Sequence, residues 1–262
     1  MMNQLTPIVK NLILLNVVIF AAMWLLPDQY KFVYNDYFSL HKPSFSLVHD
    51  ASVQVDGVKC FVPKQGLELT DGTMIPHDQI QATLDASPKL AQQYKGVFRA
   101  DSFKPLQIIT HFFSHSLTFI FHILFNMMVL ASFGPILETI MGPKRFLAFY
   151  LFCGVMGGVL ISLLDPSLAP VVGASGAIFG VMVAFAMYFP KQKLSIMFLP
   201  FGFEARWFVP AIGIMSAVFV ILQYLGIDAG GPISHFGHLA GMISAILFFY
   251  IEKYLPLGLN NR

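Results

Sequence analysis

Charge is what this sequence has least of. Only 11% of its 262 residues are Asp, Glu, Lys or Arg, whereas about 25% is usual in a soluble domain. Because a water-exposed surface needs charged side chains, this composition excludes an ordinary soluble globular protein. The net charge is only +2, and no basic run interleaved with aromatic residues occurs, so we expect no nucleic-acid partner.

Cysteine is scarce as well, and no Gly-rich phosphate-binding loop is present. Cys60 and Cys153 fall in regions of very different polarity, so we do not expect them to pair. Two thiols are too few for a cysteine-based zinc site. The sequence therefore carries no signal for a metal or any other cofactor, and we expect none.

Apolar residues are abundant, at 56% of the chain. A helix that crosses a bilayer needs about 20 mostly apolar residues, and six stretches predict such helices: residues 9–26, 117–137, 146–164, 174–189, 206–225 and 234–252. The fold class is therefore an all-α membrane protein with a six-transmembrane-helix bundle. The fourth stretch is short, which predicts that one of its ends is buried in protein or lines a water cavity.

The charges of the short loops predict the orientation of the bundle. The basic residues lie after the second and fourth stretches: Lys144, Arg145, Lys191, Lys193 and Arg206. Asp165 and Asp228 lie in the loops after the third and fifth. The positive-inside rule then places both termini in the cytoplasm. The compact layout, without an organelle-targeting signal, favours a multi-pass protein of a bacterial inner membrane.

Residues 27–104 are the one extended polar region and lie outside in this topology. Alternating stretches around Asp56-Gly57 and Asp71-Gly72 predict two β-hairpins, and residues 77–95 predict a helix broken near Pro88. We divide the chain into a first transmembrane helix (1–26), an outer loop with a small polar α+β insertion (27–104), a five-helix membrane core (105–255) and a cytoplasmic tail (256–262). The insertion is either a tolerated surface feature or a substrate-recruiting element.

Polar residues within the predicted spans are few, and each is a functional-site hypothesis because such residues are costly in a membrane. They are His122, Asn126, Ser175, His235 and His238. Each one alone has a structural reading, since an intramembrane serine can bond to a helix carbonyl and a histidine or asparagine can join two helices. Their combination points instead to a serine hydrolase.

Ser175 is the candidate nucleophile. It lies between Gly173 and Gly176 at the predicted start of a helix, where missing side chains let a substrate approach. The start of a helix also offers free N–H groups and positive potential for an oxyanion. Because residue 177 is alanine, the Gly-x-Ser-x-Gly pattern of soluble hydrolases is not met.

His238 is the candidate general base. It is flanked by Gly237 and Gly241, and the fourth stretch carries a matching pair of small residues in Gly176 and Gly180. Helices pack closely along such faces, so we expect these two spans to bring His238 within hydrogen-bonding distance of the nucleophile.

His122 and Asn126 are candidate oxyanion donors. Their i, i+4 spacing places them on one face of a helix. Both side chains can donate a hydrogen bond to a developing oxyanion, which typically contributes about 10²–10³ in rate for each donor.

Together these residues resemble the rhomboid family of intramembrane serine proteases. The resemblance covers about residues 105–252 and rests on four blocks in the family's order: His122-Ile123-Leu124-Phe125-Asn126; Gly134-Pro135-Ile136-Leu137-Glu138 with Gly142 and Arg145-Phe146; Gly173-Ala174-Ser175-Gly176-Ala177-Ile178-Phe179-Gly180; and His238-Leu239-Ala240-Gly241-Met242.

The resemblance implies a catalytic dyad of Ser175 and His238 without an acidic third member. It also implies an oxyanion hole formed by His122, Asn126 and the backbone N–H of Ser175, and it places Phe179 against the imidazole of the base. The implied reaction, through an acyl-enzyme, is hydrolysis of peptide bonds in or near transmembrane segments of membrane-protein substrates within a lipid bilayer.

Three features depart from the family pattern. An insertion occupies about residues 45–102, Leu106 stands where the family has tryptophan, and His115 precedes His122 by seven residues, farther than is usual. The sequence assigns no role to His115 or His235, and no oligomeric state. The alternative function is that of a rhomboid-like, non-catalytic membrane protein that binds clients, although such relatives lack the serine or the histidine.

Overall fold

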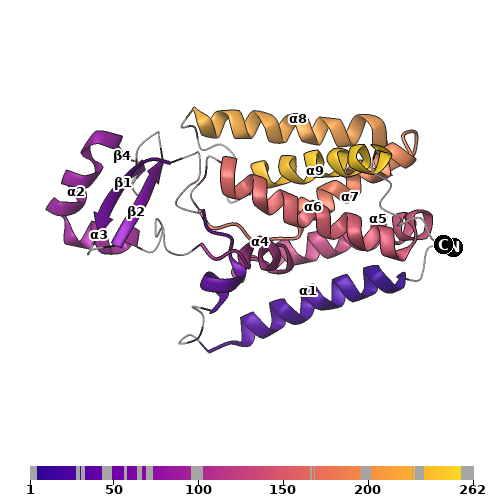
Figure 1. The fold of residues 1–262 in the computed structure, drawn as a ribbon, viewed down its shortest axis with the longest axis horizontal. Coiled ribbons are helices and arrows are strands. Elements are labelled where there is room, and N and C mark those ends of the chain that lie inside the picture. The colour runs from indigo at the N-terminus through magenta and orange to yellow at the C-terminus, as the bar shows by residue number, and fades with distance from the viewer. Residues whose placement is uncertain are drawn as a thin grey trace.

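The computed structural model describes most of the bundle and parts of the long outer loop. The described residues are 5–27, 30, 33–42, 49–55, 58–63, 67–68, 73–95, 103–165, 167, 169–195, 202–225, 227 and 233–254. Within them, apolar helices form one bundle, and a small α+β insertion lies beyond one end of it (Figure 1). The predicted fold class is confirmed.

The bundle consists of helices that match the predicted spans. Five are long and apolar enough to cross a membrane: α1 (Pro7–Leu25), α5 (Phe121–Met141), α6 (Pro143–Leu164), α8 (Ala205–Tyr224) and α9 (His235–Tyr254). The sixth, α7 (Ser175–Tyr188), has only 14 residues. Proline is the first residue of α1 and of α6. Its missing N–H costs nothing there, because an N–H at the start of a helix has no acceptor within the helix.

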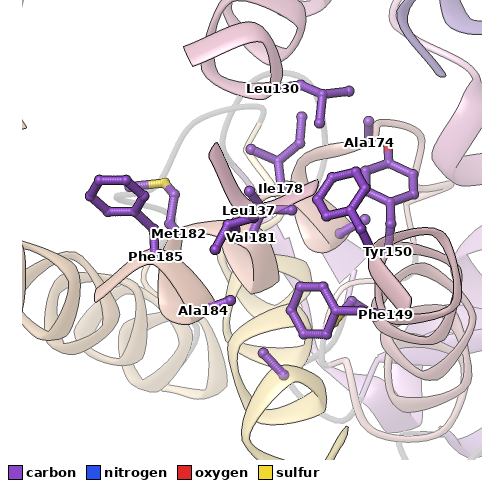
Figure 2. Close-up of a cluster of buried hydrophobic side chains, with 14 of the residues drawn as sticks. Leu130, Leu137, Phe149, Tyr150, Ala174, Ile178, Val181, Met182, Ala184 and Phe185 are labelled. Atoms are coloured by element: carbon purple, nitrogen blue, oxygen red, sulfur yellow. The ribbon is translucent and has the colours of Figure 1, made fainter. Parts of the chain in front are cut away.

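The short helix α7 lies at the centre of the bundle. It packs against α5, α6, α8 and α9, and Figure 2 shows Ile178 and Val181 of α7 beside Leu137 of α5. Its buried residues are Ala177, Ile178, Gly180, Val181, Met182, Val183, Ala184 and Phe185. A helix enclosed by other helices need not span the lipid, which explains its length.

The insertion contains the two predicted hairpins. Strands β1 (His49–Val55) and β2 (Val58–Pro63) pair antiparallel with Val55 opposite Val58. Strands β3 (Leu67–Glu68) and β4 (Met74–Ile75) form the second hairpin. The short turn η3 (His77–Gln79) leads into α2 (Ile80–Ala86) and α3 (Pro88–Lys95), which confirms the predicted break near Pro88. The two Asp-Gly tips lie outside the described residues.

The two chain segments that lead into and out of the insertion are fastened together at the bundle. They contain η2 (Tyr34–Phe38) on one side and α4 (Gln107–Thr110) with η5 (His111–Phe113) on the other. The buried side chain of Gln107 accepts hydrogen bonds from the N–H groups of His41, at 3.2 Å, and Lys104, at 3.1 Å. It also donates a hydrogen bond to the Asp36 carbonyl at 2.9 Å. These two hydrogen-bonded segments form the base from which the insertion projects.

This base is joined to the connection between α6 and α7. Leu40 and Val171 exchange backbone hydrogen bonds of 2.9 and 3.0 Å. Beside them, Lys42 and Asp165 form a buried ion pair at 3.4 Å. Because this connection leads directly to Ser175, the first loop braces the start of α7.

At the other end of the bundle, polar contacts fix the helix ends. The buried carboxylate of Glu138 accepts hydrogen bonds from the hydroxyl of Thr6 and from the N–H groups of Ile8 and Val9, at the start of α1, where a negative charge is favoured. The hairpin of β5 (Lys193–Ser195) and β6 (Gly202–Glu204) connects α7 to α8 on this side.

Candidate active site

Ser175 is the first residue of α7 and is half-buried. The chain reaches it through Gly173, whose φ of +129° lies in a region that glycine adopts far more readily than other residues. The N–H of Gly173 donates to the His111 carbonyl at 3.0 Å, which holds the turn in place. At the first residue of a helix, the N–H of Ser175 has no acceptor within the helix.

Gly173 also brings Ser175 and His122 close to one point. A Cβ atom placed on Gly173 would lie 2.6 Å from Nε2 of His122 and 3.7 Å from Oγ of Ser175. Any side chain larger than hydrogen would therefore push the imidazole away. The missing side chain lets the imidazole and the hydroxyl converge from two different helices.

His122 presents Nε2 as a hydrogen-bond donor. Its Nδ1 accepts the N–H of Ser116 at 3.4 Å, so the single proton of the neutral imidazole is carried by Nε2. This is the nitrogen that faces Gly173. The hydrogen bond from Ser116 therefore favours an N–H donor on the side of the ring that faces Gly173.

Asn126 lies one helical turn after His122 on α5. Its side chain is only 7% exposed, and its Nδ2 has no hydrogen-bond partner. A buried donor without an acceptor costs about 1–3 kcal/mol, and an orphaned group of this kind calls for an explanation such as a functional role. This amide is therefore free to donate to an added acceptor, and its role as an oxyanion donor stays a prediction.

Helices α7 and α9 approach each other backbone to backbone. A Cβ atom on Gly241 would overlap the carbonyl of Gly176, and one on Gly176 or Gly180 would lie 3.3 Å from a carbonyl oxygen of α9. The predicted glycine faces therefore do pack against each other. Ser175 and His238 each lie within a few residues of this contact.

His238 is held by an aromatic ring. Its imidazole stacks on Phe179 of α7, with ring centroids 4.0 Å apart and planes inclined by 9°, as the family resemblance implies. No hydrogen bond joins Ser175 to His238 within the described helices. Catalytic hydrogen bonds are often long in the absence of substrate, and the Ser175–His238 pair stays a prediction.

His235 packs beside the candidate base. It stacks on Phe219 of α8 at 4.4 Å, and its ring meets that of His238 edge to face at 5.9 Å. Among the residues that the structure describes, no three His, Cys, Asp or Glu side chains are grouped so that they could hold a metal ion.

Two supporting contacts could not be anticipated from the sequence. The His111 carbonyl anchors the turn before Ser175, and the hydroxyl of Tyr34 donates to the carbonyl of His115 at 3.0 Å. In both cases the partners are far apart in the sequence and one of them is a backbone atom, so no residue pattern signals the contact.

The fold and the site together define a class of protein. It is a multi-pass membrane bundle in which the helix that begins at Ser175 packs through glycines against the helix that carries His238. The model of the Rhomboid domain matches residues 102–254. The chain belongs to the rhomboid family and is a multi-pass integral membrane protein.

Curated relatives match about half of this chain. The human presenilin-associated rhomboid-like protein, mitochondrial, is 35% identical over 151 residues, which are 55% of this chain and 37% of that protein. Rhomboid protein 1, mitochondrial, of Saccharomyces cerevisiae is 32% identical over 155 residues, or 56% of this chain and 42% of that protein. Rhomboid protease GluP of Bacillus subtilis is 32% identical over 123 residues, or 47% and 21%. The chain thus spans less than half the length of each of these relatives.

The contact between α7 and α9 can be tested by adding one methyl group. Gly241→Ala places a Cβ on the carbonyl of Gly176 and must push the helices apart. We expect the free energy of unfolding in detergent to fall by at least about 2–3 kcal/mol, with loss of any activity that needs both helices. Gly157→Ala is the matched control, because its Cβ would meet only the Gly241 nitrogen, at 3.9 Å. Equal thermal stability of the two variants would contradict this account.

Proposed function

We propose that this protein is an intramembrane serine protease that hydrolyses peptide bonds in or near transmembrane segments of other membrane proteins. The observation that carries the proposal is the convergence of Ser175 Oγ and His122 Nε2 on Gly173, with an unpartnered Asn126 amide one turn away. Two hydrogen-bond donors on one face of α5, near a serine at a helix start, support an oxyanion hole at this position.

In the proposed reaction, His238 removes the proton of the Ser175 hydroxyl as Oγ attacks the peptide carbonyl. The resulting oxyanion accepts hydrogen bonds from the Ser175 N–H, from Nε2 of His122 and from Nδ2 of Asn126. His238 then protonates the leaving amine, and an acyl-enzyme remains. Water, deprotonated by His238, attacks the ester carbonyl and regenerates Ser175.

The stacked ring of Phe179 orients the base in this mechanism. In a triad, a carboxylate holds the imidazole in the productive orientation. Here the 4.0 Å stack of Phe179 on His238 restricts the tilt of the imidazole, so two residues are sufficient as the reacting pair. The mechanism requires no cofactor.

The substrate class follows from the position of the site. Ser175 begins an enclosed helix within a membrane bundle, so the scissile bond must be presented at the membrane. A helical segment hides its peptide carbonyls in backbone hydrogen bonds, and helix-breaking residues near its outer end would let the chain extend toward Ser175. We therefore propose membrane-spanning proteins with such a segment as substrates.

We also propose that the start of α1 and the end of α9 lie on the cytoplasmic side and Ser175 nearer the outer side. The exposed Lys144, Lys191, Lys193 and Arg206 all lie at the end of the bundle opposite Ser175, as the positive-inside rule requires. The mitochondrial names of the human and yeast relatives weigh against the expected bacterial inner membrane, and we propose the orientation alone.

The proposed dyad predicts which variants lose activity. In liposomes with a transmembrane reporter substrate, Ser175→Ala and His238→Ala should each lower cleavage by at least about 10³-fold. A fluorophosphonate should label the wild type but not Ser175→Ala. Ser132→Ala is the control, since this exposed hydroxyl bonds only to its own helix, at 2.8 Å from the Met128 carbonyl. Cleavage by Ser175→Ala at the wild-type rate would sink the proposal.

The oxyanion role of Asn126 predicts a change in turnover rather than in substrate binding. Asn126→Leu keeps the approximate shape of the side chain but removes the donor, so kcat should fall by about 10²–10³-fold with little change in KM. Thermal stability should hold or rise, because a buried donor without a partner is removed. An unchanged kcat would exclude this role.

The orientation predicts opposite labelling of two single-cysteine proteins. Cys60 is first replaced by serine and Cys153 by alanine. In that protein, the exposed residues Ala169 and Lys191 are then changed to cysteine, one in each variant. In intact spheroplasts an impermeant maleimide should label Ala169→Cys, and Lys191→Cys only after permeabilisation. The reverse pattern would invert the proposed topology.

A further inference from the structure

The connection between η5 and α5 carries a histidine that the proposed reaction does not use. His115 is fully enclosed, with 0% of its surface exposed, and neither of its ring nitrogens has a hydrogen-bond partner. Burying an imidazole in this way costs about 1–3 kcal/mol. Since no hydrogen bond of its own sets the direction of this ring, its neighbours must do so.

The principal neighbour of this ring is a predicted oxyanion donor. The rings of His115 and His122 meet edge to face, with centroids 5.1 Å apart and planes inclined by 70°, a favoured geometry for aromatic pairs. Residues 114–120 form no helix, which allows His115 to fold back onto His122 despite the long spacing between them. The edge-to-face contact opposes rotation of the His122 ring.

The backbone of His115 is anchored to the first loop. Tyr34, in η2, donates its hydroxyl to the His115 carbonyl at 3.0 Å. Burial raises the pKa of Tyr34 to about 12, so the hydroxyl keeps its proton at neutral pH. Burial, together with nearby His122, lowers the pKa of His115 to about 3, so its ring is uncharged. The contact with His122 is therefore maintained by a neutral ring on a fixed backbone.

Three contacts together define the orientation of His122. The Ser116 N–H holds Nδ1 at 3.4 Å, Gly173 leaves room for Nε2, and the ring of His115 limits the tilt. The hydrogen bond is long, so it constrains the ring weakly by itself. The edge-to-face contact is needed to keep Nε2 directed at the space beside Ser175.

We propose that His115 is a positioning residue, which holds the imidazole of His122 so that its Nε2–H points at the oxyanion formed on the substrate. This inference rests on the proposed protease function. His115 touches neither the substrate nor the nucleophile and acts only through His122, and Tyr34 supports it from the first loop.

The test is a double-mutant cycle on kcat, normalised to the number of Ser175 sites that a fluorophosphonate labels to completion. His115→Ala should lower kcat by about 10- to 100-fold, because a displacement of about 1 Å at a reacting group costs this much, with KM nearly unchanged. In the His122→Ala background, His115→Ala should cause no further loss. Ser132→Ala, which removes an exposed hydroxyl bonded only to its own helix, should leave kcat unaltered.

Each outcome has a distinct meaning. If His115→Ala lowers kcat equally in the wild type and in the His122→Ala protein, His115 acts independently of His122. If His115→Ala leaves kcat per labelled site unchanged, His115 only supports folding. Either result overturns the inference. His115→Phe retains a ring and should recover most of kcat, and failure to do so while the protein labels normally would also overturn it. If Ser175→Ala still cleaves the substrate, the protease function itself fails, which is a separate result.

Discussion

The contact between Gly176 and Gly241 is the constraint on which the rest of this structure depends. A backbone carbonyl of α7 lies against the α-carbon of Gly241 on α9, with no room for a methyl group. Within a lipid bilayer, helices gain little from hiding apolar surface, so close packing of small residues holds them together. The same packing places α7, which carries Ser175, beside α9, which carries His238. The stability of the bundle and the candidate chemistry therefore depend on the same contact.

Two side chains near His122 carry buried polar groups that have no hydrogen-bond partner. Asn126 and His115 both carry such groups, and both lie near His122. Each orphaned group costs stability, of the order of 1–3 kcal/mol, and a donor held in place before the reaction needs no reorganisation when charge develops. In the proposed mechanism, this loss of stability is offset by donors that are already in place when the oxyanion forms.

The first loop also forms hydrogen bonds that hold other parts of the bundle in place. Its base is bonded to Gln107, to Val171 in the connection before Ser175, and through Tyr34 to His115. These bonds close the chain on itself at the bundle, and the hairpins and helices of the insertion lie beyond that point (Figure 1). The loop thereby supports two parts of the candidate active site: the start of α7 and, through His115, the candidate oxyanion donor His122 on α5.

The sequence alone was sufficient for the six helices, the two hairpins and the candidate residues, because apolar length, Asp-Gly pairs and rare intramembrane polar residues are local signals. It also predicted the glycine-lined contact, since the spacing of small residues marks a helix face. Only the tertiary structure decided which nitrogen of His122 faces Ser175, that Gly173 has a positive φ, and that His115 folds back onto His122. These features depend on contacts between residues far apart in the chain and on backbone atoms that every residue possesses, and no pattern of side chains records them.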